Sequence, residues 1–351
     1  MLYIVFLTAK CNLSCKYCGG SIDPNIMPSE ITYDLKLLKN FVEKDENAIL
    51  AFYGGEPLLR PSLMEEIMDE IDAKHFVLQT NGLFLKKVRK KYLKKLSTIL
   101  ISIDGVKEVN DYYKGEVYEK VMENVRWLKK FYCGDLIARM VANEKTDIFR
   151  DVRHLLSVGF DRVHWQINAV WSPDGLWTDF GSWIKEYNTG ISKLVDWWVK
   201  EIENGVVRGI VPFLGIFKAF LFEPNVSPPC GAGKTSFSIT TDGKITACPI
   251  CAEFEWNKLG DLESGIKKFV DILEPCKSCN FSTICGGRCL FFNRERLWGD
   301  EGFKLVCGSC KHLINEIERV IPRIKGYVKE GRVDLRDLQY PKFNNTTEII
   351  P

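Results

Sequence analysis

The sequence predicts an α/β protein in which parallel β-strands alternate with α-helices, followed by a smaller cysteine-rich region. Two observations predict this class. Short apolar, β-branched segments recur through the first half of the chain, between stretches whose apolar residues lie three or four positions apart. From residue 230 onward the composition changes, because nine of the 13 cysteines fall between Cys230 and Cys310.

Six segments have the length and composition of buried strands: Leu2–Leu7, Ala48–Tyr53, His75–Gln79, Thr98–Ile103, Leu136–Ala142 and Arg162–Ile167. Helical periodicity marks the stretches Ile31–Val42, Leu63–Ile71, Tyr118–Phe131, Ile148–Val158, Ile191–Glu203 and Leu313–Ile321, the last expected to stop near Pro322. Parallel strands need crossover connections, so these units predict a parallel sheet with helices outside it. Periodicity leaves open whether the sheet is doubly wound or a curved partial barrel. In both cases the active site lies at the C-terminal ends of the strands.

Composition sets the broad class of the protein. At about 150 residues per domain, 351 residues suggest about two domains. The 48 basic and 46 acidic residues nearly cancel, so no overall field predicts nucleic acid or a membrane as a partner. The longest apolar stretch, Ile210–Phe222, is too short to span a membrane and contains Pro212 and Lys218. With no export signal we expect a cytoplasmic protein with reduced thiols, which favours metal ligation for the cysteines.

One stretch is strongly basic. A phosphate-binding surface is one interpretation, but Leu85, Val88, Leu93 and Leu96 give the same stretch an apolar side, so we expect a solvated outer helix. The basic residues are Lys86, Lys87, Arg89, Lys90, Lys91, Lys94 and Lys95.

Three cysteines follow the first predicted strand. Cys11, Cys15 and Cys18 lie within eight residues, and three thiolates at this spacing can hold one cubane of four irons while the fourth iron stays open to a cofactor or substrate. A zinc site is the alternative, but zinc needs four closed ligands in a structural site.

The C-x3-C-x2-C spacing, with Tyr17 beside the third cysteine, resembles the signature of the radical S-adenosylmethionine (radical SAM) superfamily. The resemblance extends to later strand ends and implies a partial, TIM-like (β/α)6 barrel. It implies that Gly54, Gly55, Glu56 and Pro57 form the loop that receives the methionine amino group, that Gln79, Asn81, Ser102 and Asp104 lie on the ribose side, and that Arg139 pairs with the methionine carboxylate or forms a structural ion pair.

The implied chemistry belongs to the cofactor. In this superfamily a reduced [4Fe–4S] cluster donates one electron to S-adenosylmethionine, and the 5′-deoxyadenosyl radical that forms takes a hydrogen atom from the substrate. The protein positions the reactants and excludes water. An external reductant of ferredoxin or flavodoxin type is implied as a partner.

The later cysteines resemble the SPASM domain, the auxiliary-cluster module of radical enzymes that modify peptides and proteins. The resemblance implies a distal [4Fe–4S] cluster on Cys276, Cys279, Cys285 and Cys307, and a nearer one on Cys230, Cys248 and Cys289, so that there are three clusters in all. Zinc is again the alternative, because the pairs Cys276/Cys279 and Cys307/Cys310 have the spacing of zinc knuckles.

Three departures from the SPASM pattern carry information. No cysteine precedes Cys230 closely, so either Cys251 supplies the fourth ligand or the near cluster has an open iron that could bind a substrate thiolate. Pro249 stands where sulfatase-maturing relatives have an aspartate beside the cysteine, which disfavours formylglycine formation. The first strand begins at Leu2, so we expect no leader-peptide domain before it. Cys133 and Cys310 stay unassigned. We expect buried structural thiols at both positions, with Cys310 as the alternative to Cys307.

Taken together, the sequence predicts a radical SAM barrel over residues 1–205, a connecting segment over 206–229, a SPASM-type domain over 230–311, and a C-terminal helix and tail over 312–351. The expected function is oxidative modification of a peptide or protein, with a thioether or carbon–carbon cross-link as the leading outcome, assisted if needed by a separate peptide-recognition partner. Peptide epimerisation, small-molecule cofactor biosynthesis and a non-enzymatic iron–sulfur electron carrier are the alternatives.

Overall fold

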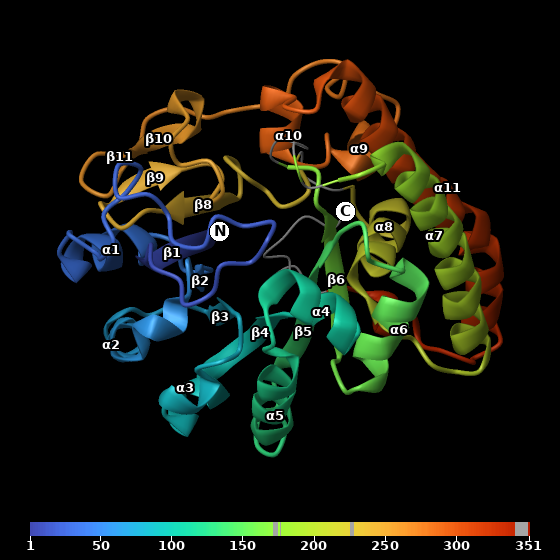
Figure 1. The fold of residues 1–351 in the computed structure, drawn as a ribbon, viewed down its shortest axis with the longest axis horizontal. Helices are drawn as coiled ribbons and strands as arrows, with labels where there is room; N and C mark the ends of the chain where they lie inside the picture. The colour runs from blue at the N-terminus through green and yellow to red at the C-terminus, as the bar shows by residue number, and fades with distance from the viewer. Residues whose placement is uncertain (171–174, 176, 225–227, 341–349) are drawn as a thin grey trace. The chain divides into compact units, whose positions relative to one another are not determined.

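The computed structural model describes residues 1–170, 175, 177–224, 228–340 and 350–351 (Figure 1). Residues 225–227 of the expected connecting segment and 341–349 of the expected tail lie outside this part. The chain divides into two compact units. The first contains residues 1–103, 110–137 and 231–271, and the second contains 104–109, 138–230 and 272–351.

The first unit is built on a parallel sheet. Strands β1 to β4 lie side by side in chain order, and β1 is buried along its whole length, as its unbroken apolar sequence predicts (Figure 1). The strands are β1 (Leu2–Thr8), β2 (Ile49–Gly54), β3 (His75–Thr80) and β4 (Leu96–Ser102). The helical segments of this unit that link or follow them are α1 (Leu35–Val42), η1 (Pro57–Leu59), α2 (Pro61–Glu70), η2 (Leu85–Lys87), α3 (Lys90–Lys95) and α5 (Tyr118–Leu128).

The start of the cysteine-rich region extends the same sheet. Strand β8 (Ser236–Ile239) pairs in parallel with β1, with Leu2 opposite Ser236. Three antiparallel strands and a short helix continue from there, giving the order β11-β10-β9-β8-β1-β2-β3-β4 in this unit. They are β9 (Lys244–Thr246), η3 (Glu255–Asn257), β10 (Lys258–Asp261) and β11 (Gly265–Ile266). The sequence did not indicate this pairing, because more than 200 residues separate the two strands.

The second unit is mainly helical around short parallel strands. Strand β6 (Arg162–Ile167) pairs in parallel with β7 (Gly209–Ile210). Helices α7 and α11 lie alongside each other and are joined by an ion pair between Arg319 and Asp196 at 2.9 Å (Figure 1). The helical segments are α6 (Ile148–Ser157), α7 (Phe180–Glu203), α8 (Val211–Leu221), α9 (Ser282–Cys285), α10 (Leu290–Glu295), α11 (Gly299–Lys329) and η4 (Leu335–Leu338); α4 (Lys107–Lys114) and β5 (Asp135–Ala142) pass from one unit into the other.

The predicted α/β class is confirmed, and all six predicted strands form within two residues of their expected ends. The predicted C-terminal helix is wrong in extent. Helix α11 begins at Gly299 and continues through Pro322 to Lys329, because packing against α7 outweighs the backbone hydrogen bond that a proline cannot donate. No helix in the described part of the chain is long and apolar enough to cross a membrane.

The basic stretch forms two short helical segments, η2 and α3, with Leu85, Leu93 and Val88 buried beneath them. Several of its cations have acidic partners, as in the pairs Arg89–Glu65 at 2.6 Å and Lys95–Asp69 at 3.7 Å. The structure therefore supports the expectation of a solvated outer surface.

Candidate cluster and cofactor site

The three clustered cysteines lie in the loop that follows β1, in the first unit. Cys11 and Cys15 are half-buried and Cys18 is exposed. The Cys18 N–H donates to the Cys15 carbonyl at 2.9 Å, which forms a turn between those two thiols. The Leu13 N–H donates to Cys11 Sγ at 3.5 Å. Such a bond to sulfur favours the thiolate, which is the form that binds iron.

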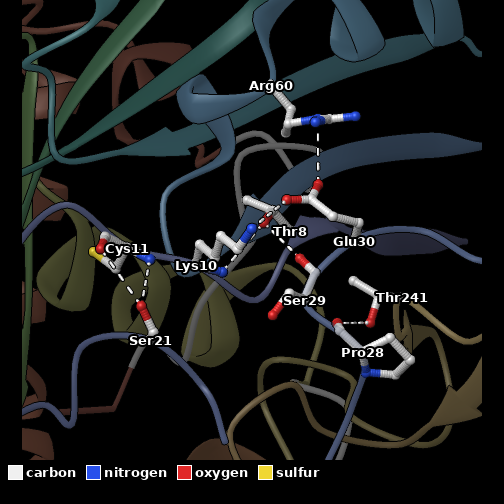
Figure 2. A network of polar contacts seen from close by, with 9 residues as sticks. All are labelled: Thr8, Lys10, Cys11, Ser21, Pro28, Ser29, Glu30, Arg60 and Thr241. Carbon is white, nitrogen blue, oxygen red and sulfur yellow. Dashed lines mark hydrogen bonds and ion pairs between the residues drawn. The ribbon is translucent and has the colours of Figure 1, made fainter. Parts of the chain in front are cut away.

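Contacts within the chain itself hold the backbone around Cys11. The Cys11 N–H donates to Ser21 Oγ at 2.9 Å (Figure 2). Just before it, Lys10 pairs with Glu30 at 3.1 Å, and the other Glu30 oxygen faces Arg60 at 3.3 Å (Figure 2). The loop is thus tied to the segment 21–30 and to the start of α2.

The loop after β2 packs on the backbone that leads to Cys11. The Gly55 N–H donates to the Thr8 carbonyl at 3.0 Å, and the Glu56 N–H donates to the Lys10 carbonyl at 2.8 Å. A Cβ at Gly54 or Gly55 would collide with these same two carbonyls, and Gly54 has φ +145°, which favours glycine. The two glycines are therefore needed because this loop lies against the Thr8 and Lys10 carbonyls. These carbonyls belong to the end of β1 and to the start of the cysteine loop.

Glu56 turns its carboxylate into the protein. It is 1% exposed and accepts three hydrogen bonds, from the Leu58 N–H at 2.9 Å, Thr80 Oγ1 at 2.6 Å and the Asn81 N–H at 2.8 Å. Burial raises the pKa of Glu56, although these donors oppose the shift. Burial also raises the pKa of Cys11, and the nearby charges of Glu56 and Cys18 add to that rise.

The other predicted residues of this unit lie at neighbouring strand ends. Asn81, just after β3, donates from Nδ2 to Asn12 Oδ1 in the cysteine loop at 2.9 Å. Gln79 and Ser102 are half-buried near the ends of β3 and β4. The centre of the Tyr17 ring lies 5.9 Å from that of the Tyr113 ring. This contact holds Tyr17, which precedes Cys18, against the end of α4.

Asp104 and Arg139 belong to the second unit. Asp104 is fully buried and accepts the Val141 N–H at 2.9 Å, so its carboxylate fixes strand β5 two residues from Arg139. Arg139 Nη1 lies 2.7 Å from Nδ1 of His164 on β6. The buried His164 therefore accepts a hydrogen bond from the Arg139 guanidinium and fixes its direction.

Three of the four cysteines expected to hold the distal cluster have raised pKa values in the second unit. Burial raises the pKa of Cys276 to about 11, and the charges of Cys285, Cys307 and Cys279 contribute. Burial also raises the pKa of Cys307, with Cys285 and Cys279 again contributing. Cys285 has its pKa raised first by a hydrogen bond with Cys310 and then by burial. Four thiols, three of which act on the pKa of Cys276, have the chemistry of a donor set for a fully ligated iron–sulfur cluster.

Cys248 and Cys251 are buried in the first unit and share one clamp. Asn257, itself fully buried, accepts the Cys248 N–H at 2.8 Å and donates to the Cys248 carbonyl at 2.9 Å and the Cys251 carbonyl at 2.8 Å. The turn that carries both thiols is therefore rigid. Cys230 and Cys289 belong to the second unit, the former half-buried and the latter buried.

All 13 cysteines are free thiols. The expectation of a buried thiol is wrong for Cys133, which is exposed after α5, and is confirmed for Cys310. Among the described residues no three acidic, histidine or cysteine side chains converge on one point as a single metal ion requires. Cluster ligands bind separate irons, so they need not meet at one point.

Comparison with known families settles the class of the protein. The sequence profile of the Radical SAM superfamily matches residues 5–158, which include the cysteine loop and the strand ends described above. Residues 5–158 thus form a radical SAM domain, and the chain is a radical SAM enzyme whose cofactors are S-adenosylmethionine and [4Fe–4S] clusters.

Relatives match over most of the radical SAM chain. It is 24% identical to the cysteine-type anaerobic sulfatase-maturating enzyme of Clostridium perfringens (strain 13 / Type A), over 90% of this chain and 95% of that protein. A shorter stretch, 44% of this chain and 47% of the relative, is 31% identical to the AdoMet-dependent heme synthase of Methanosarcina barkeri.

Solved structures share the fold. Native anSMEcpe with bound AdoMet and Cp18Cys peptide has a TM-score of 0.70 at 20% identity, covering 94% of this chain and 99% of that chain. SuiB of Streptococcus suis bound to the precursor peptide SuiA has a TM-score of 0.55 at 14% identity, covering 83% and 72%.

Four residues with a role around this radical SAM site were not predicted. Asn12 and Ser21 hold the cysteine loop, Thr80 holds Glu56, and Asn257 holds the Cys248–Cys251 turn. Asn12 lies inside the cysteine triplet, so its position was a usable signal. Nothing in the sequence distinguishes Asn257 from other asparagines of a turn.

Proposed function

We propose that this radical SAM enzyme modifies a peptide or protein, and that the product carries an oxidative thioether or carbon–carbon cross-link. The observation that carries the proposal is the second thiol group, Cys276, Cys279, Cys285 and Cys307, which is separate in sequence from the Cys11 loop. The charges of the other three thiols help to raise the pKa of Cys276. Auxiliary clusters of this kind are the feature by which the chain resembles peptide-modifying enzymes. Its relatives include sulfatase-maturating enzymes, and similar folds have been solved with peptides bound.

Residues of the first unit would hold the catalytic cofactors. Cys11, Cys15 and Cys18 would ligate the catalytic cluster, with the loop Gly54–Pro57 and residues Gln79, Asn81 and Ser102 around S-adenosylmethionine. When bound, these cofactors supply one electron that cleaves a carbon–sulfur bond and so begins hydrogen abstraction. Glu56 contributes by fixing the loops, since its carboxylate is satisfied by the chain's own donors.

Arg139 and Asp104 would take part in cofactor recognition, as the family resemblance implies. Arg139 is a suitable partner for the methionine carboxylate because a guanidinium offers paired donors and His164 fixes its direction. Asp104 supports the same strand through the Val141 N–H. Cys230, Cys248, Cys289 and Cys251 would hold the near auxiliary cluster, and an open iron in place of Cys251 is the alternative that favours a thioether at a bound substrate thiolate.

The sequence-based division into a barrel over 1–205, a connecting segment over 206–229, a SPASM-type domain over 230–311 and a C-terminal region over 312–351 is part of this proposal. So are an external ferredoxin-type or flavodoxin-type reductant, a cytoplasmic setting and a separate peptide-recognition partner. Formylglycine formation is disfavoured because Pro249 lacks the carboxylate that could remove a proton beside Cys248.

One specific observation favours a second candidate. Heme-synthase relatives match 44% of the chain at 31% identity, so a tetrapyrrole side chain is the alternative substrate class. Peptide epimerisation and simple electron transfer have weaker support. An electron carrier needs no strand-end loops for a second cofactor, yet these loops are present.

The test is co-production with a candidate peptide from a neighbouring reading frame, followed by mass spectrometry of the peptide made in heavy water. A cross-link removes two hydrogens, whereas epimerisation leaves the composition unchanged and introduces deuterium at the α-carbon. The matched control replaces Cys11, Cys15 and Cys18 with Ala together, which should abolish both the modification and the release of 5′-deoxyadenosine. Release that equals this variant's background would overturn the enzymatic proposal, and turnover of a porphyrin but no peptide would favour the second candidate.

A further inference from the structure

Cys11 is held from both sides by one residue of the neighbouring loop. On one side, the Glu56 N–H donates to the Lys10 carbonyl at 2.8 Å. On the other, Glu56 Oε2 accepts the Asn81 N–H at 2.8 Å, and Asn81 Nδ2 donates to Asn12 Oδ1 at 2.9 Å. Residues 10 and 12, which flank Cys11, are therefore both connected to Glu56.

We propose that Asn12 is a positioning residue for the catalytic cluster, holding the Cys11 thiol in place through Asn81 and Glu56. The inference deepens the proposed function and rests on its assignment of Cys11 as a cluster ligand. In this role Asn12 acts through Cys11.

The chain of hydrogen bonds has a buried, fully engaged anchor. Glu56 is 1% exposed and Asn81 is 8% exposed, whereas Asn12 is exposed. Bonds inside the protein are stronger than bonds in water, so the buried end fixes the exposed one. The Asn81 contact adds to the Ser21 bond and the Leu13 N–H, which restrain the same part of the loop.

The direction of the amide bond is set by a further contact. Asn81 Oδ1 accepts the Leu83 N–H at 3.0 Å, so its Nδ2 must face Asn12, and Asn12 must present an acceptor. An aspartate at position 12 keeps that acceptor. An aspartate at position 81 also permits a bond, because the Asn12 amide can turn and donate. Two aspartates leave acceptor facing acceptor, so only the double substitution breaks the contact without shortening either side chain.

The first measurement uses the metal-free protein. We expect Asn12→Ala to speed alkylation of Cys11 by iodoacetamide roughly fivefold, the factor that corresponds to about 1 kcal/mol for one hydrogen bond. Asn12→Asp and Asn81→Asp alone should stay close to the wild type, and the double variant should be faster despite its added negative charge. Asn47→Ala, which removes an exposed bond to Lys74 in the same unit, is the matched control and should change nothing.

The second measurement follows reconstitution with iron and sulfide. Asn12→Ala and the double variant should alter the electron paramagnetic resonance spectrum of the reduced catalytic cluster, while Asn12→Asp keeps it. Alkylation rates and spectra that are the same in all four variants would overturn the inference. A wild-type protein without a Cys11-dependent cluster would instead overturn the proposed ligand set, and the alkylation pattern would still report on Asn12. Melting temperatures of the metal-free variants show whether any of them fails to fold.

Discussion

Arg139 and His164 meet through a 2.7 Å contact between Nη1 and Nδ1, and His164 is 1% exposed. A guanidinium has only donors, so Nδ1 must be the unprotonated nitrogen of the imidazole. The pair therefore orients Arg139 through a neutral acceptor, because the imidazole nitrogen itself carries no charge.

We expect His164→Leu to weaken binding of S-adenosylmethionine to the reconstituted enzyme roughly tenfold, because Arg139 loses the acceptor that orients it. His164→Gln keeps an acceptor oxygen and should recover most of the affinity. Anaerobic equilibrium dialysis measures both. Equal losses in the two variants would mean that His164 serves core packing alone.

A second prediction concerns the Cys248–Cys251 turn that Asn257 clamps. If Cys251 is the fourth ligand of the near cluster, Cys251→Ala should leave one iron without a protein ligand. Up to about four irons per chain should then be lost easily, while the remaining clusters persist. Asn257→Ala should weaken the same cluster less severely, because the thiols remain but their backbone is freed. Iron analysis and Mössbauer spectroscopy report the loss. Cys133→Ala, at an exposed and unassigned cysteine, is the control; iron content in Cys251→Ala that matches this control would favour an open iron.

A third prediction separates Cys307 from Cys310 on helix α11. The charge of Cys307 helps to raise the pKa of Cys276, and the charges of Cys285 and Cys279 help to raise the pKa of Cys307. Cys310, in contrast, raises the pKa of Cys285. Cys310 is also buried, with Sγ 3.6 Å from the Pro351 carbonyl. We expect Cys307→Ser to lose the distal cluster and Cys310→Ser to keep it, as judged by iron content. The reverse result would exchange their roles.

The sequence located what depends on local patterns. The six strands follow from periodicity, and the spacing of the cysteine triplet led to the family resemblance that supplied the strand-end motifs. The pairing of distant strands and the geometry of side chains did not follow from local patterns. Nothing local indicates that β8 pairs with β1, that Glu56 faces inward to Thr80, or that Asn257 clamps two cysteines. Helix α11 passes Pro322 because tertiary packing outweighs a local preference.

A fourth prediction follows from the burial of Glu56. Its folded-state pKa is raised above 4.5, so its contribution to stability is complete below that value and is lost as the pH rises through the folded pKa. Glu56→Gln does not titrate. The unfolding free energy of the wild type minus that of Glu56→Gln should therefore fall as the pH rises above 4.5. Urea unfolding of the metal-free proteins across this range measures the difference. A difference that grows with pH would show that the three donors outweigh burial.

The last prediction concerns Pro322, which lies exposed inside α11. A proline in a helix interior lacks the N–H for one hydrogen bond and crowds the preceding turn, at a cost of about 3 kcal/mol relative to alanine. Helix α11 bears this cost because its other face packs on α7, where Ser309 donates to Asn188 Oδ1 at 2.6 Å. Pro322→Ala should therefore stabilise the protein, by about 1 to 3 kcal/mol in denaturant unfolding. Lys325→Ala, also exposed on the same helix, is the control for a general gain in helix propensity. A loss of stability in Pro322→Ala would mean that a bend at this residue is needed for α11 to follow α7.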